Sequence, residues 1–150
     1  VDYLWPNPTG VDLSCAGADC TWAIPGCEQP WEFSANGHLY WYCDALQTAP
    51  DAWNTCLTAD VNMVTVGGAG EDDFVWAMLV DDAWIGASDG TTEGVWEWVT
   101  GEAFSYDGWK DGEPDGAYGD EDCAVMQSYA GYWYDRYCDL QYGFVCEYSY

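Results

Sequence analysis

The chain has 150 residues, a length that suits one folded domain. Apolar residues make up 49% of it, which excludes an intrinsically disordered chain, and it lacks the run of about 18 apolar residues that a membrane-spanning helix needs. The formal net charge is −25, with two Lys or Arg against 27 Asp or Glu, which excludes nucleic acid and anionic membrane surfaces as partners.

The first residues differ in character from the rest. The chain opens at Val1 without a Met, and Pro and Gly punctuate residues 1–26. We interpret the chain as a mature form from which any targeting segment has been removed. Residues 1–26 are expected to form an N-terminal extension, and residues 27–150 the domain itself.

Eight cysteines in a chain of this length indicate an oxidising compartment. The alternative would be zinc, but no C-x-x-C pair occurs and His38 is the sole histidine of the sequence. The pattern therefore predicts structural disulfides and a secreted, extracellular protein.

The predicted regular elements begin with a strand over Leu39–Cys43, where aromatic and apolar residues dominate. Pro50 is placed to start a helix in its first turn. The β-branched run Val61–Val66 predicts a strand. The acidic residues Glu71–Asp73 precede the apolar run Phe74–Val80, and acidic side chains in a first turn favour the helix dipole, so a second helix is expected there.

The last third is rich in turns, acidic residues and aromatic residues. Its short apolar runs predict strands over 83–86, 95–99, 124–127, 132–134 and 143–147. Between Gly101 and Asp122 lies a long segment with little regular pattern, and loops of that length in a compact domain are usually functional. Two helices followed by many short strands predict an α+β domain.

Several motifs follow one another in this part of the chain. In order they are Ala52-x-x-x-Cys56, Trp84-Ile85-Gly86, Trp96-x-Trp98, Trp109, Glu113-Pro114-Asp115, Glu121-Asp122-Cys123, Trp133-Tyr134-Asp135-x-x-Cys138 and Phe144-Val145-Cys146-Glu147. In this order and spacing they resemble the C-type lectin-like domain, and in particular mannose-binding-protein-type carbohydrate-recognition domains, from about residue 27 to residue 147. The resemblance implies a fold in which two helices flank short antiparallel strands and a long loop region binds calcium.

The resemblance also implies two disulfides, Cys56 with Cys146 and Cys123 with Cys138. Long-form members of the family pair an early cysteine with one at the start of the first long strand. That second position is Leu39 here, but Cys43 lies four residues later on the same strand face. We therefore expect Cys27 to pair with Cys43, and Cys15 with Cys20. A Cys15–Cys43 link would overturn this assignment.

The resemblance places a sugar-binding calcium site in the long segment. In the family the peptide bond before the proline of Glu113-Pro114-Asp115 is cis, which turns both flanking side chains toward one ion. With Glu121 and Asp135 these residues would supply the carboxylate oxygens that calcium prefers.

Two departures leave the sugar open. The mannose-type motif has Asn where Asp115 stands, and the galactose-type motif has Gln where Glu113 stands, so both side chains here accept hydrogen bonds and neither donates. Tyr134 stands where sugar-binding members carry a ligand Asn. Its hydroxyl could donate to a sugar, or its ring could stack on one, so Tyr134 is counted with Glu113, Asp115, Glu121 and Asp135 as carbohydrate-binding.

A second, auxiliary calcium site is expected from Asp89, Glu93, Glu121 and Asp122, whose surroundings resemble the loop that lends carboxylates to a second ion in mannose-binding relatives. One further family ligand is replaced by Gly116, which has no side chain to contribute.

These residues predict a calcium-dependent lectin that coordinates sugar hydroxyls directly. One such site would bind a monosaccharide with a Kd around millimolar, about 4 kcal/mol, so a homo-oligomer or polymer is expected to provide useful affinity. The competing hypothesis is a structural or self-assembling protein of the same fold that binds no sugar, which would suit the 11 Trp and 12 Tyr. Catalysis is not expected, because one histidine offers no nucleophile–His pair.

The remaining expectations concern single side chains. Trp84, Trp96 and Trp98 are expected in the core, and Trp109 and Trp133 in the core or supporting the loop. Lys110 and Arg136 are expected to pair with local carboxylates, and His38 is given no role.

Overall fold

The computed structural model describes residues 23–116 and 119–149. Its elements are β1 (Trp31–Phe33), β2 (His38–Gln47), α1 (Ala49–Thr58), β3 (Asn62–Met63), α2 (Ala69–Met78), β4 (Ala83–Ser88), β5 (Glu97–Trp98), β6 (Cys123–Met126), β7 (Trp133–Arg136) and β8 (Tyr142–Tyr148). Two helices and a strand-rich remainder confirm the predicted α+β class.

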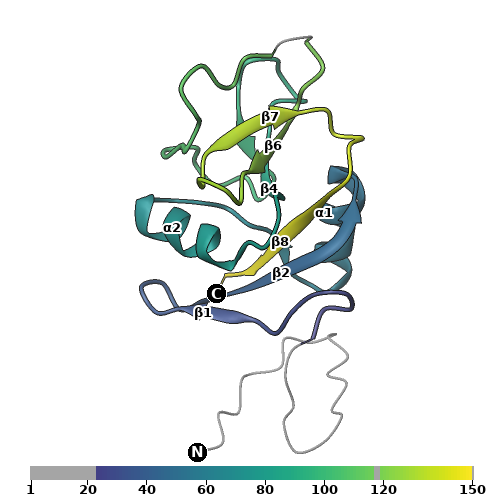
Figure 1. Ribbon diagram of the computed structural model, residues 1–150, viewed down its shortest axis with the longest axis vertical. Helices are drawn as coiled ribbons and strands as arrows, with labels where there is room; N and C mark the ends of the chain where they lie inside the picture. The colour runs from purple at the N-terminus through teal and green to yellow at the C-terminus, as the bar shows by residue number, and fades with distance from the viewer. Residues whose placement is uncertain (1–22, 117–118, 150) are drawn as a thin grey trace, which may run out of the picture.

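The strands form one sheet in the order β1-β2-β8-β4-β6-β7, with β3 pairing with β8 and β5 with β4. All pairs are antiparallel except β4 with β8, which run parallel. Figure 1 shows two halves: β1, β2, β8 and both helices lie in the lower half of the described residues, and β6, β7 and the long loops lie in the upper half. Because the last strand lies in the middle of the sheet, residues distant in sequence are brought together across it.

The first helix confirms its prediction and starts where local chemistry dictates. The Thr48 hydroxyl accepts a hydrogen bond from the Asp51 amide at 3.3 Å, which caps α1, and Pro50 occupies its first turn. Ala52 and Cys56, four residues apart, are its buried face.

The second helix is shifted from its predicted position. It begins at Ala69, before the acidic residues, and ends at Met78 rather than Val80. Gly68 is its N-cap and provides no side-chain cap, so Glu71 and Asp72 in the first turn supply the favourable charge.

The strand predicted over Val61–Val66 is shorter in the structure and spans only Asn62–Met63. The residues after it leave the regular ladder because Val64 bridges two strands: its amide donates to Val145 in β8 at 3.0 Å, and its carbonyl accepts from Gly86 in β4 at 2.9 Å. A Cβ at Gly86 would lie 2.8 Å from that carbonyl, so this close crossing requires the glycine of the Trp84-Ile85-Gly86 motif.

Among the described residues, Trp41, Trp84 and Trp133 are fully buried, and Trp98 is 2% exposed. Trp84 and Trp98 therefore lie in the core as predicted, whereas Trp96 is half-buried and packs against the core. The short strand β1 was not predicted, because three residues with an exposed pattern carry little periodic signal.

Three disulfides join described residues: Cys27–Cys43, Cys56–Cys146 and Cys123–Cys138. These are the pairings expected for those six cysteines, and they leave no free thiol among the described residues. The expected Cys15–Cys20 pair lies outside the described residues.

Candidate functional site

The carboxylates of Glu113, Asp115 and Asp135 form a cluster at the loop end of the molecule. Each offers one oxygen, and these oxygens lie within 4.8 Å of one another. The first two flank a cis Glu113–Pro114 peptide bond in the long loop, and Asp135 lies in β7.

Strand β7 holds the loop in place along its free edge. The Lys110 amide donates to the Trp133 carbonyl at 3.1 Å, and the Glu113 amide donates to the Lys110 carbonyl at 2.8 Å. Within β7, Trp133 and Asp135 are buried while Tyr134 between them is half-buried, the alternation expected of a strand. The core thus fixes Trp133, and through the strand it fixes the carboxylate two residues later.

Asp135 is 1% exposed and clamps the loop through both oxygens. Oδ1 accepts from the Asp115 amide at 3.2 Å, and Oδ2 accepts from the Gly116 amide at 2.8 Å. Burial acts to raise the pKa of Asp135, but hydrogen bonds from Glu113 and from these amides outweigh it and hold the pKa below its ordinary value. Asp135 is therefore a fixed negative charge.

Glu113 has the opposite electrostatics. Burial, the hydrogen bond with Asp135 and the charges of Asp115 and Asp135 raise the pKa of Glu113 to about 7. Its Oε2 atom is buried and has no hydrogen-bond partner. Carboxylates that repel one another around an unsatisfied oxygen fit a divalent cation, because a hard ion such as calcium takes oxygen ligands and neutralises the repulsion.

A second cluster joins Asp89, Glu93 and Asp122, whose nearest carboxylate oxygens also lie within 4.8 Å of one another. Asp89 is 4% exposed; its Oδ2 accepts from the Gly94 amide at 2.9 Å, while its buried Oδ1 has no partner. The charge of Asp89 raises the pKa of Glu93, and burial and then Asp89 raise the pKa of Asp122. Like the first cluster, this one combines converging carboxylates, raised pKa values and a buried oxygen without a hydrogen-bond partner.

The two clusters adjoin at Gly116. A Cβ placed on Gly116 would lie 3.4 Å from Glu93 Oε1, so the loop that carries Glu113 and Asp115 passes directly beside the second cluster. We call the two clusters together the loop carboxylate site.

Glu121, expected in both sites, is not among the carboxylates that converge in either cluster. It directly precedes Asp122 in the segment before β6, and its role as a ligand stays a prediction.

The two cations of the sequence both lie over one aromatic ring. Lys110 Nζ is 5.2 Å, and Arg136 Cζ 4.8 Å, from the ring centroid of Tyr134. A hydrogen bond with Tyr134 raises the pKa of Lys110, and Arg136 also donates from Nη1 to the Asp135 carbonyl at 2.7 Å. The sequence led us to expect carboxylate partners for both residues, and the contact with the Tyr134 ring was not predicted. The pattern of a strand does not indicate which side chains cover the strand.

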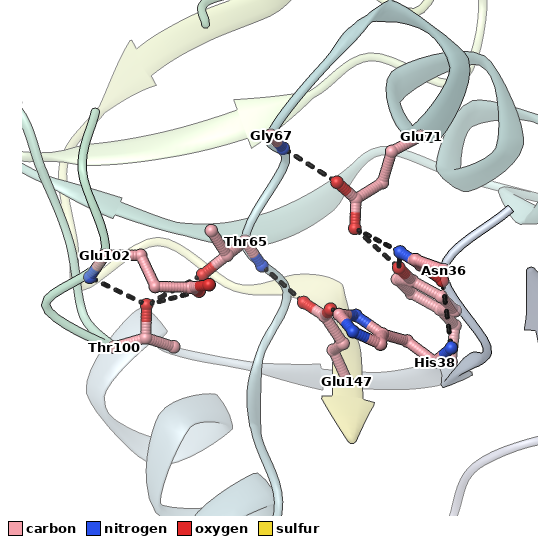
Figure 2. A network of polar contacts seen from close by, with 9 residues as sticks. Asn36, His38, Thr65, Gly67, Glu71, Thr100, Glu102 and Glu147 are labelled. Carbon is pink, nitrogen blue, oxygen red and sulfur yellow. Dashed lines mark hydrogen bonds and ion pairs between the residues drawn. The ribbon is translucent and has the colours of Figure 1, made fainter. Parts of the chain in front are cut away.

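A third group of ligand atoms lies in the other half of the molecule, where His38, Glu71 and Glu147 meet (Figure 2). His38 Nδ1 is 2.6 Å from Glu147 Oε1, and the Thr65 amide donates to Glu147 Oε2 at 2.9 Å. Glu71 accepts from the Tyr40 hydroxyl at 2.5 Å.

The Gly67 amide donates to the other Glu71 oxygen at 2.7 Å. Every carboxylate oxygen of this group thus has a donor, and its members come from β2, β8 and the first turn of α2. We interpret it as a structural latch, which gives His38 the partner that sequence reasoning did not.

Residues 45–148 match the model of the Lectin C-type domain family, which is more than half of the chain. The chain therefore belongs to the C-type lectin domain family. The galactose-specific lectin nattectin of Thalassophryne nattereri is 27% identical over 144 residues, which cover 89% of this chain and 90% of that protein.

Solved structures agree on the fold. The carbohydrate-recognition domain of the mouse scavenger receptor C-type lectin superposes with a TM-score of 0.74 at 29% identity, covering 85% of this chain and 96% of that one. A calcium-independent type II antifreeze protein superposes with a TM-score of 0.73 at 16% identity, covering 88% and 98%, which shows the fold alone. Within residues 23–116 and 119–149, neither helix is long and apolar enough to cross a membrane.

Proposed function

We propose that this protein is a calcium-dependent carbohydrate-binding lectin whose primary calcium ligands are Glu113, Asp115 and Asp135. One observation carries the proposal: these three carboxylates converge, and the buried Glu113 Oε2 among them has no hydrogen-bond partner. Asp89, Glu93 and Asp122 would hold an auxiliary ion on the same grounds. The resemblance adds Glu121 to both ligand sets, although Glu121 lies outside the two converging groups.

The residues around the cluster support direct sugar recognition. When bound, calcium would supply coordination positions to two neighbouring sugar hydroxyls. Glu113 and Asp115 can only accept hydrogen bonds, so those hydroxyls would donate to them. Lys110 and Arg136 lie over the Tyr134 ring and can only donate hydrogen bonds, so neither would take up the phenolic proton, which would remain available to a sugar oxygen. Tyr134 and Lys110 would thus provide the donors that the acidic triplet lacks.

The proposal also includes an extracellular location and an oligomeric form. The three disulfides among the described residues support an oxidising, extracellular location. A single shallow site binds a monosaccharide weakly, so the functional form would present several sites in a homo-oligomer.

A second candidate function is that of a C-type lectin-like interaction protein that binds no sugar. Tyr134 favours it, because the two cations cover the ring where sugar-binding relatives carry a ligand Asn. Under this hypothesis the carboxylates would bind calcium for stability only.

The deciding experiment is a calcium titration by calorimetry, followed by a glycan array with calcium and with a chelator. We expect saturable calcium binding and glycan signals that disappear in the chelator. Glu113→Gln should abolish the high-affinity calcium heat, while Asp139→Asn, which changes an exposed carboxylate outside both clusters, should leave it unchanged. Calcium binding without any glycan signal would favour the second function, and no calcium heat would refute the first.

A further inference from the structure

A pocket of about 220 Å³ opens between α2 and the segments 106–109 and 130–132, and none of its lining residues belongs to the loop carboxylate site. Its aromatic and acidic wall residues are Asp72, Asp73, Trp76, Tyr106, Trp109 and Tyr132. Neither the latch nor the loop carboxylate site uses any of these side chains.

The aromatic walls are held in fixed positions. The Trp76 indole donates from Nε1 to the Ser128 carbonyl at 2.8 Å and packs on Gly131, where a Cβ would lie 2.9 Å from the ring. Trp76 and Tyr132 nevertheless remain 39% and 51% exposed. Trp109 is anchored edge-on against Trp96, with ring centroids 4.6 Å apart. The pocket thus presents rigid aromatic surface to solvent.

The acidic floor is also fixed. Asp72 accepts from the Trp133 indole at 2.8 Å and from the Tyr106 hydroxyl at 3.2 Å. A Cβ at Gly108 would lie 2.7 Å from the Trp133 indole nitrogen and 3.2 Å from Asp72 Oδ2, so the glycine permits this packing. Burial raises the pKa of Asp72, and the two donors oppose that rise.

The electrostatic potential in the pocket is negative. Burial and then the charges of Asp72, Asp73 and Asp107 raise the pKa of Tyr106 to about 12. No Lys or Arg lines the pocket, and both cations of the sequence lie over Tyr134 instead. A negative potential does not attract a neutral sugar, whereas a cation is attracted both by the carboxylates and by the electron-rich ring faces.

We propose that this pocket binds a compact organic cation, an alkylammonium or trimethylammonium group, with Trp76, Trp109 and Tyr132 as ring faces and Asp73 as counter-charge. A bare metal ion fits less well, because the indole rings offer no oxygen ligand, neutral phenols are poor ligands and both Asp72 oxygens already have donors. The proposal is independent of calcium and sugar binding.

The test compares choline with 3,3-dimethylbutan-1-ol, its neutral isostere of the same shape, titrated into the full chain in 150 mM NaCl and followed by saturation-transfer NMR. The salt suppresses non-specific attraction of cations to the net charge of −25. We expect saturable choline binding at least tenfold tighter than that of the isostere, both with calcium and in excess chelator. Equal binding of the two compounds, or none of choline, would overturn the proposal.

Matched variants locate the site. Tyr132→Leu and Asp73→Asn should each weaken choline binding at least threefold, because they remove an exposed ring face and the free counter-charge. Tyr129→Leu, at a tyrosine that is 86% exposed outside the pocket, and Asp44→Asn, on the exposed side of β2, should change nothing. Circular dichroism and urea unfolding verify the fold of all four. Equal losses in pocket and control variants would show that choline binds elsewhere.

Discussion

Buried carboxylate oxygens occur in both halves of this protein; those of the latch and of Asp135 all have hydrogen-bond partners, but two others in the loop carboxylate site have none. In the latch, Glu147 is 7% exposed and both of its oxygens have partners, His38 and the Thr65 amide. In the loop carboxylate site, Glu113 Oε2 and Asp89 Oδ1 are buried without one.

The difference is the basis on which we interpret Glu147 as a carboxylate that stabilises the fold and propose a cation for Glu113 and Asp89. Leaving a buried acceptor unsatisfied costs about 1–3 kcal/mol, so such an atom persists where a ligand compensates for it. Convergence alone does not mark a metal site, since all three groups have ligand atoms within 4.8 Å of one another.

Removing one disulfide from each half should give the largest effects. The Cys56–Cys146 link closes a loop of 90 residues and ties α1 to β8, whereas Cys123–Cys138 closes 15 residues beside β7. Replacing both cysteines of a pair by Ala should cost about 4–5 kcal/mol for the first link and about 3 kcal/mol for the second, measured by urea unfolding in chelator.

Only the second replacement should also weaken calcium binding in the folded protein, because Cys138 lies three residues after Asp135. Equal calcium affinities in the two disulfide variants would show that the link does not position the site.

The latch should matter for stability whether or not calcium is present. Glu147→Ala removes the partner of His38 and leaves the Thr65 amide without an acceptor, so unfolding should become easier by about 2–4 kcal/mol. Urea unfolding should give the same loss with calcium and in chelator, and Glu32→Ala on the exposed face of β1 serves as the control. A loss confined to the calcium form would place the latch among the calcium-binding groups.

The loop carboxylate site should respond to pH through Glu113. Its pKa is about 7 in the calcium-free fold, above the ordinary value of 4.5, so the protonated form is the one that the calcium-free fold favours. Its contribution to calcium-free stability is therefore present below pH 4.5 and is lost as the pH rises through 7. Calcium requires the ionised form, so lowering the pH from 8 to 6 should weaken calcium affinity about tenfold. Where Glu113 is protonated before binding, calcium binding should release that proton.

Calorimetry in buffers of different ionisation enthalpy measures the number of protons released per calcium bound. The residual calcium binding of Glu113→Gln should lose this dependence near pH 7. A dependence that persists in Glu113→Gln would assign the proton to another group.

The smallest effect is expected at Tyr134. Tyr134→Phe keeps the ring under Lys110 and Arg136 but removes the phenolic donor, so calcium affinity should stay constant while sugar affinity falls about three- to tenfold. Tyr129→Phe is the matched control at an exposed tyrosine. Unchanged sugar binding would mean that the hydroxyl makes no contact with the sugar.

Local signals in the sequence were enough for much of the fold. Pro50 marks the start of α1, the aromatic run in β2 marks a strand, and the order of the tryptophan and cysteine motifs indicates the family. These features depend on neighbours in sequence, so they can be read without knowing the rest of the molecule. Predictions were weakest where a distant segment decides the backbone, as at Val64, whose carbonyl is bonded to Gly86 of β4.

The sequence by itself determined which carboxylates are candidates to bind a cation, and only the tertiary structure decided which of them lie close together. Seven acidic residues were predicted as ligands; six converge in two clusters, and Glu121 does not. The same packing placed Lys110 and Arg136 on Tyr134 and gave His38 its partner in β8. The physical reason is that hydrogen-bond satisfaction and charge repulsion depend on distances in space, which strand order and loop closure set and which spacing along the chain does not.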